Sequence, residues 1–316
     1  MRRIASSPSR VGLLALCGAL TWLVAGPLST SVAGGQARGR GGAPAAPRTA
    51  RELAPIDLTG NWVAVVTEDY RWRMVTPPKG DVSSIPVNAE ARKVADAWDL
   101  ARDTAAGLQC KAFGVGGIMR QPGRLRVSWA DPATLKLEFD AGTQTRLLTF
   151  GPAPAPAERT WQGQSVGVWE GPGVGRGAEA PPGPGAGPAG QVVVPGGGGQ
   201  GLRGGPPPRG IASIQRGGSL KVTTTQFREG YLRKNGVPYS EQAVITEYFH
   251  RLPAYPNGDQ WLHVTTIIED PRYLTQPFYT STQFKLEADG TKFNPTPCVT
   301  VPPLPVVERA RPAPAR

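Results

Sequence analysis

The sequence predicts an all-β protein with one short helix, folded as a single antiparallel β-barrel or barrel-like sandwich of about nine strands. Three observations support this expectation. Apolar and polar residues alternate in segments along residues 57–170 and 218–300, which is typical of half-buried strands. Turn signals such as Asn235-Gly236 and Asn257-Gly258 separate these segments. Between the two stretches, residues 171–210 contain 16 Gly and 9 Pro, a composition that does not form the interior of a helix or sheet.

Each expected strand follows from a local alternation. Leu125, Val127 and Trp129 alternate with polar residues, and Asp131-Pro132 turns the chain into the next alternating segment. By the same reasoning we expect strands at 61–67, 125–129, 135–139, 144–150, 161–169, 219–227, 242–251, 260–269 and 277–287. Neither half has enough strands to close a barrel, and long surface insertions cost little loop entropy. We therefore expect one β-domain over 57–300 that is interrupted by a disordered insertion at 171–217; two small domains are the alternative.

One segment has helical periodicity. Val94, Ala95, Trp98 and Ala101 fall on one face of a helix over 88–102, and Asn88 is a candidate N-cap.

The N-terminus is typical of an export signal. Residues 1–33 combine a basic start, a 16-residue apolar run from Val11 to Gly26, and small residues before a cleavage site between Ala33 and Gly34. The run is short for a membrane span, which needs about 20 residues, although an uncleaved anchor is the alternative. We expect a periplasmic or secreted protein, with no stable membrane span after signal removal, and Arg2-Arg3 leaves twin-arginine export open beside the general route.

The net charge of +11 lies in the flanks of the chain. Residues 57–170 and 218–300 hold 21 basic and 21 acidic residues, so the expected domain is neutral. A nucleic-acid partner is not expected, because it needs clustered basic residues on a formed surface. We expect disorder in the linker 34–55 and the tail 301–316, and the basic Gly/Pro segments leave contact with an envelope polymer open.

Cysteine and histidine are scarce. Only three Cys and two His are present, too few for a dedicated zinc or iron–sulfur protein. We expect no metal and no cofactor, with metal chemistry based on carboxylates left open as the alternative. Signal removal leaves Cys110 and Cys298, an even pair that predicts a disulfide in an oxidising compartment. Two unpaired buried thiols are the alternative.

Several polar residues are candidates for a site. Glu247 shares its strand face with Ile245 and Phe249, and a carboxylate on an apolar face needs a partner. Arg146 is the expected partner, either in a structural ion pair or in a pair that orients a ligand.

Asp270, beside Glu269, would orient a ligand or bind Ca²⁺, or else lie solvated in a turn. His263 is a candidate general base or a surface histidine. Ser165, in Gly163-Gln164-Ser165-Val166-Gly167, matches a nucleophile-elbow pattern but is not followed by a helix, so we assign no catalytic residue.

The segment Asp57-Leu58-Thr59-Gly60-Asn61-Trp62 resembles the G-x-W start of lipocalin-like barrels. That resemblance implies that Trp62 packs at the closed end of a barrel and that Gly60 permits a close backbone approach.

A wider resemblance covers most of residues 57–300. The chain is similar to a group of exported bacterial proteins of unknown function, through DLTGNW at 57–62, WQGQSVGVWEG at 161–171, NGVPYS at 235–240 and EDPRYLT at 269–275. It departs from them by its Gly/Pro insertion and by lacking a DGRxHP element. The resemblance implies a single interrupted domain and a Cys110–Cys298 bridge, and it implies no reaction.

The leading expectation for function is a binding module for a small, partly apolar ligand, with Trp62, Arg146, Glu247, His263 and Asp270 as candidate binding residues. A carboxylate-based hydrolase or isomerase and a structural, envelope-associated module are the alternatives. The sequence leaves open whether the chain is an enzyme.

Overall fold

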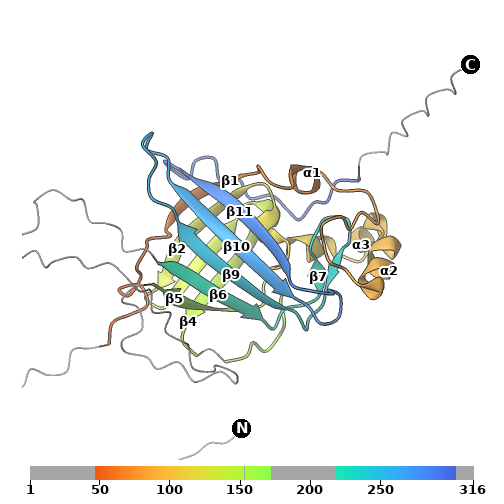
Figure 1. Ribbon diagram of the computed structural model, residues 1–316, viewed down its shortest axis with the longest axis horizontal. Helices are drawn as coiled ribbons and strands as arrows, with labels where there is room; N and C mark the ends of the chain where they lie inside the picture. Colours follow the sequence, from red (N-terminus) through yellow and green to blue (C-terminus); the bar gives the residue numbers. More distant parts are fainter. Residues whose placement is uncertain (1–46, 153, 172–217, 304–316) are drawn as a thin grey trace, which may run out of the picture. The chain divides into compact units, whose positions relative to one another are not determined.

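The computed structural model describes residues 47–152, 154–171 and 218–303. Nine strands form a closed barrel in the order β1-β11-β10-β9-β6-β5-β4-β3-β2, which confirms the predicted barrel (Figure 1). Their bounds are β1 Gly60–Val65, β2 Arg124–Asp131, β3 Thr134–Phe139, β4 Gln144–Phe150, β5 Gln164–Glu170, β6 Ser219–Thr225, β9 Val244–Arg251, β10 Trp261–Glu269 and β11 Phe278–Glu287. The predicted signal peptide and its Ala33–Gly34 cleavage site, residues 172–217 of the insertion and residues 304–316 of the tail lie outside the described residues.

One pair of neighbours departs from the expected antiparallel arrangement. β4 and β5 run parallel, with Leu148 opposite Ser165 and Phe150 opposite Gly167, whereas the other neighbouring pairs in the barrel are antiparallel. Strand directions alternate without exception around a closed ring only if the number of strands is even. A barrel of nine strands therefore contains at least one parallel pair.

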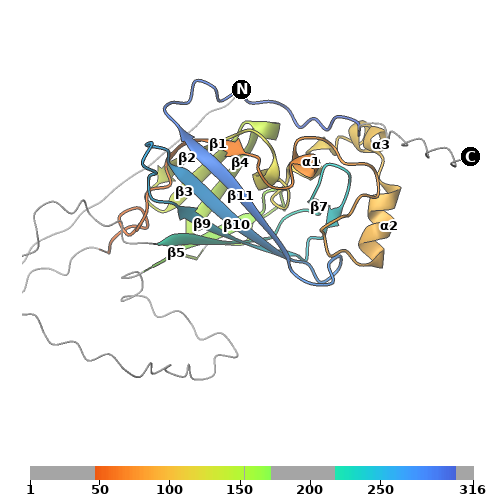
Figure 2. The same cartoon turned by 45° about the horizontal axis from the view of Figure 1, so that its top comes forward.

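Helices gather at one end of the barrel, together with a short hairpin (Figures 1 and 2). They are α1 Tyr70–Arg73, α2 Ala89–Ala97, α3 Leu100–Ala105 and the 3₁₀ turns η1 Gln109–Phe113, η2 Ile118–Arg120 and η3 Ala141–Thr143; the hairpin pairs β7 Gly230–Tyr231 with β8 Pro238–Tyr239. This hairpin and α1 were not predicted, because two- and four-residue elements carry no periodicity.

The single helix expected over 88–102 is two helices. Asn88 caps the first as predicted and accepts a hydrogen bond from the Ala91 amide at 2.9 Å. Trp98 then adopts an extended conformation, and Asp99 caps the second helix by accepting from the Arg102 amide. The break turns the buried Trp98 ring onto the Asn235-Gly236 turn, where a Cβ on Gly236 would lie 2.2 Å from that ring.

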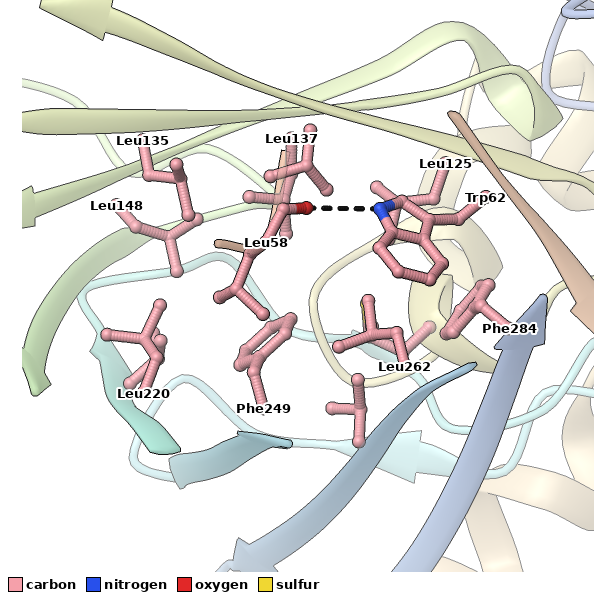
Figure 3. Packing of buried hydrophobic residues seen from close by; sticks show 14 of the residues in the cluster. Leu58, Trp62, Leu125, Leu135, Leu137, Leu148, Leu220, Phe249, Leu262 and Phe284 are labelled. Atoms are coloured by element: carbon pink, nitrogen blue, oxygen red, sulfur yellow. Dashed lines mark hydrogen bonds between the residues drawn. The ribbon is translucent and has the colours of Figure 1, made fainter. Parts of the chain in front are cut away.

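The barrel interior is filled by its own side chains (Figure 3). Leu125, Leu148, Leu220 and Leu262 have no exposed surface, and a side chain without exposed surface borders no space large enough for a water molecule. They belong to a cluster that also contains Leu58, Trp62, Leu135, Leu137, Phe249 and Phe284. A second cluster, which includes Ile245, Tyr239 and Phe278, lies toward the helical end.

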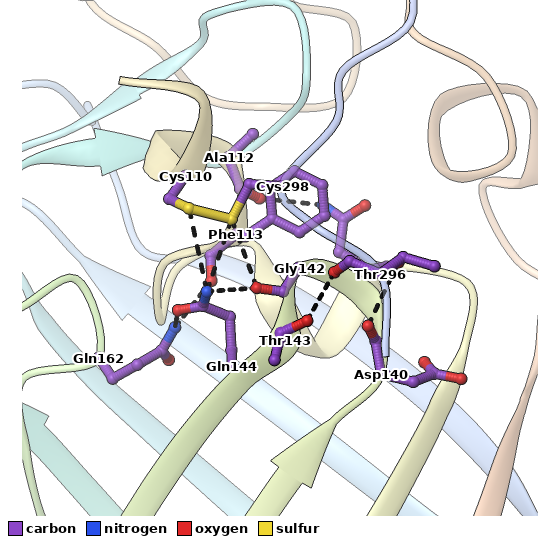
Figure 4. The surroundings of a disulfide bond; sticks show 11 residues. Cys110, Ala112, Phe113, Asp140, Gly142, Thr143, Gln144, Gln162, Thr296 and Cys298 are labelled. Atoms are coloured by element: carbon purple, nitrogen blue, oxygen red, sulfur yellow. Dashed lines mark hydrogen bonds between the residues drawn. A yellow bond between two sulfur atoms is a disulfide. The ribbon is translucent and has the colours of Figure 1, made fainter. Parts of the chain in front are cut away.

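The Cys110–Cys298 disulfide is present (Figure 4). It joins η1 to the segment that follows β11, and the Thr296 amide extends this attachment by donating to the Asp140 carbonyl at 2.8 Å. The bridge therefore fastens the C-terminal segment to the helical end of the barrel.

Part of the linker that we expected to be disordered has a defined conformation. In residues 47–55, the Arg51 amide donates to the Pro132 carbonyl, and the Trp169 indole donates to the Ala50 carbonyl at 2.8 Å. Sequence composition missed this segment, although Ala54 also packs against the main apolar cluster, because two of its long-range attachments are made by backbone groups. In the part of the chain that the structure describes, no helix has both the length and the apolar character needed to cross a membrane.

Candidate functional site

The Arg146–Glu247 ion pair lies inside the barrel. Arg146 is 1% exposed and Glu247 is 0% exposed. Two Arg146 nitrogens donate to the two carboxylate oxygens of Glu247, at 3.2 and 2.6 Å, in a bidentate arrangement. One of them also contacts the hydroxyls of Ser165 and Thr224, at 3.3 and 3.2 Å.

This group satisfies most of its own polar atoms; the exception is Nε of Arg146, which has no partner among the described residues. The group lies between the two apolar clusters, since Glu247 is flanked on β9 by Ile245 of one cluster and Phe249 of the other. Ser165 and Thr224 complete it with a 2.8 Å hydrogen bond between their hydroxyls. The geometry is that of a structural ion pair, because the charges satisfy each other away from any opening.

The other candidate residues are not brought together. Trp62 is fully buried, and its indole donates to the Leu58 carbonyl at 3.1 Å. Gly60 beside it has φ of +141°, and a Cβ there would lie 2.7 Å from Leu286. His263 lies half-buried opposite His250 on the β9–β10 ladder, on the outward face.

Asp270 corrects the expectation of a solvated turn. It is 4% exposed and accepts hydrogen bonds from the Ser240 amide and hydroxyl, at 2.6 and 2.7 Å, and from the Arg272 amide at 2.9 Å. These partners are built into the chain, so Asp270 holds the β8–β9 connection to the turn after β10. Its neighbour Glu269 is exposed as expected.

A different set of residues lines a small surface hollow with room for about one water molecule. It is lined by Trp72, Arg73, Arg120, Gln121, Leu232, Arg233 and Lys234, and we call it the arginine pocket. α1 supplies Trp72 and Arg73, η2 supplies Arg120, and the loop between β7 and β8 supplies Arg233 and Lys234.

Two guanidinium groups in the arginine pocket lack hydrogen-bond acceptors. Arg233 is 3% exposed, and none of its three nitrogens has a partner among the described residues. Arg73, also 3% exposed, donates from Nε to the Arg120 carbonyl at 3.0 Å, but its Nη2 has no partner there. Buried cations are normally paired, because leaving one without a partner is costly.

The neighbouring carboxylates compensate the charge of these two arginines only in part. Asp69 is held by Arg120 at 2.7 Å, and Asp81 accepts from the Trp72 indole at 3.0 Å. The guanidinium of Arg233 lies 4.5 Å from the centre of the Trp72 ring, a cation–π contact that orients it.

The electrostatics agree with this arrangement. Burial, together with repulsion from Arg120, lowers the pKa of both Arg73 and Arg233 to about 10. Burial also lowers the pKa of Lys234, whose Nζ donates to the Arg73 carbonyl at 3.3 Å. The arginines remain protonated at neutral pH, so positive charge and N–H groups without acceptors lie buried directly beneath the pocket. This arrangement is suited to binding an anion.

Sequence reasoning missed this site. The one local signal is Arg233-Lys234 directly before the Asn235-Gly236 turn, inside a domain without excess charge. In the described part of the chain, no group of three or more His, Cys, Asp or Glu side chains is placed to hold a metal ion.

Comparison of the chain with family models, with curated proteins and with solved structures gives no match. The disulfide and the lack of a membrane-spanning helix among the described residues are compatible with an exported protein.

Proposed function

We propose that this chain is a periplasmic or secreted binding protein for a small anionic ligand, and that the arginine pocket receives the ligand's charged group. The observation that carries the proposal is Arg233, a buried guanidinium whose three nitrogens lack acceptors among the described residues. An anion would supply the missing acceptors and the missing negative charge together.

A hollow barrel would hold its ligand inside, whereas the ligand proposed here binds outside the barrel. Fully buried leucines fill the barrel, and the Arg146–Glu247 pair is satisfied internally. We therefore place the ligand outside the barrel, between α1, η2 and the β7–β8 loop. Leu232 and Trp72 line the same pocket. Their apolar surfaces would contact the apolar part of a ligand.

The test is anion binding by the mature chain, residues 34–316, with its disulfide formed. We expect small anions to give saturable heat in isothermal titration calorimetry at low ionic strength, and Arg233→Gln to lower the affinity at least tenfold. Arg92→Gln is the matched control, because Arg92 is exposed on α2. Absence of binding by the parent protein, or equal affinity in the Arg233→Gln variant, would overturn the proposal.

A further inference from the structure

We infer that the arginine pocket selects a tetrahedral oxyanion, a phosphate or sulfate group, over a carboxylate. This inference rests on the proposed function and adds the chemical class of the ligand. It is carried by the number of free donors in the pocket, by the charge left uncompensated there and by the shape of the guanidinium group.

The free donors outnumber the oxygens of a carboxylate. Four nitrogen atoms lack acceptors among the described residues, namely Nε, Nη1 and Nη2 of Arg233 and Nη2 of Arg73. A carboxylate offers two oxygens, whereas an esterified phosphate or sulfate offers three and the free ion offers four. The larger anion therefore matches the donor set better.

The local charge also favours a dianion. Five cations influence or line the pocket, namely Arg71, Arg73, Arg120, Arg233 and Lys234, against the three carboxylates Glu68, Asp69 and Asp81. This leaves an excess of two positive charges. Asp69 is paired with Arg120, whereas Asp81 hydrogen-bonds to the uncharged Trp72 indole and its charge acts on Arg233.

The use of arginine fits tetrahedral oxyanions. A guanidinium presents its N–H groups as a planar fork that binds two oxygens of a phosphate at once. The Arg233 fork is fixed against the Trp72 ring at 4.5 Å, and Asn235 fixes its loop by donating to the carbonyls of Pro78 and Asp81, both at 2.9 Å. The Arg233 fork and its loop are thus held in place, and an anion reaches the buried nitrogens only when the side chains over them move.

The experiment compares three probes that carry the same ring: phenyl phosphate, phenyl sulfate and benzoate. Calorimetry at pH 7.5 with the mature, disulfide-bonded chain is expected to give at least tenfold higher affinity for the first two. Inorganic phosphate and sulfate form a second arm. Affinity equal to that of the phenyl esters identifies the free ion as a sufficient ligand. Affinity at least tenfold lower identifies an esterified group. Either result supports a site for tetrahedral oxyanions.

Two variants separate charge from geometry. Arg233→Lys keeps the charge and loses the fork, so we expect a loss of affinity for phenyl phosphate smaller than that caused by Arg233→Gln. Arg73→Gln is expected to bring phenyl phosphate close to the affinity of benzoate. Circular dichroism confirms that each variant is folded, and Arg92→Gln again serves as the control.

The pH profile gives an independent readout. A phosphate monoester gains its second charge with a pKa of about 6, so its affinity is expected to rise between pH 5 and 7, whereas that of phenyl sulfate stays constant. Benzoate binding as tightly as phenyl phosphate would overturn this inference and leave the proposed function standing. Absence of binding by every probe would overturn both.

Discussion

Arg233 is the residue at which function and stability conflict. Its guanidinium is 3% exposed and has no hydrogen-bond acceptor among the described residues, so its burial opposes folding unless an anion is bound. Arg233→Met keeps the aliphatic volume and removes the charge. We expect it to raise the free energy of unfolding of the ligand-free protein by about 1–3 kcal/mol, measured by urea denaturation.

The same variant is expected to lose anion binding. The Arg92→Met change, on an exposed helical position, provides the reference for the loss of a surface arginine. A destabilised Arg233→Met protein would mean that the cation–π contact with Trp72 outweighs the cost of burial, and that Arg233 is a structural residue.

Glu247 shows the opposite behaviour, because its charge is fully compensated. Glu247→Gln leaves Arg146 as an unpaired cation inside the barrel. We expect a loss of about 3 kcal/mol in the free energy of unfolding, measured by urea denaturation with circular dichroism. The double change Arg146→Met with Glu247→Leu removes both charges and should recover most of the loss; equal destabilisation of the single and double variants would contradict an ion pair.

Arg146 and Arg233 show how far the role of a residue can be predicted from sequence. The pairing of Arg146 with Glu247 was predictable, because strand parity places both on the inward face. The arginine pocket was not, because Arg73 and Arg233 are 160 positions apart on elements too short to have a period. The lack of hydrogen-bond acceptors for these two guanidinium groups also depends on three-dimensional packing, so no sequence pattern predicts it.

At the scale of elements, the long strands were predictable and the connections were not. Alternation gave each barrel strand to within a few residues, since a period of two follows from one buried face. The parallel β4–β5 pair follows from the odd number of strands once closure is assumed, but its position does not. The break of the predicted helix at Trp98 was hidden, because it depends on the fit of that ring to a turn 137 residues later.

The stability of the β9–β10 ladder is expected to depend on pH through His250. His250 lies opposite His263, and burial, with repulsion from His263, lowers the pKa of His250 below its ordinary value of 6.5. The unfolded chain therefore takes up this proton first as the pH falls. The contribution of His250 to stability is fully present above about pH 6.5 and is lost below it.

We expect the parent protein to lose more stability between pH 7 and pH 5 than the His250→Asn variant. Urea denaturation at the two pH values measures the difference. An equal loss in both proteins would show that other groups control the acid response of this ladder.

At the scale of the whole molecule, we expect the Gly/Pro segment to be separable from the barrel. Glu170 at the end of β5 pairs with Ser219 at the start of β6, so the two ends of the segment are already side by side. Deleting residues 172–217 joins Gly171 directly to Gly218 and creates a two-residue Gly-Gly connection, which suits a hairpin. Shortening a loop to this extent is expected to add about 2 kcal/mol to the free energy of unfolding.

The deletion also tests the envelope-associated alternative. Thermal and urea unfolding of the deleted protein measure the fold, and a sedimentation assay with isolated cell-envelope material measures association. We expect a folded protein with anion binding unchanged. An unfolded product would mean that residues 172–217 are part of the domain, and a loss of sedimentation with the fold intact would favour the envelope role.

The parallel pair gives the barrel a preferred place to open. Only three residue pairs join β4 to β5, compared with seven between β5 and β6. Arg146 reaches from β4 across this junction to Ser165 on β5, Thr224 on β6 and Glu247 on β9. The ion pair and its hydroxyl partners therefore bridge the junction that has the fewest paired residues in the ring. Hydrogen exchange at the backbone amides of Thr149 and Val166 should accelerate in Glu247→Gln well before the protein unfolds as a whole.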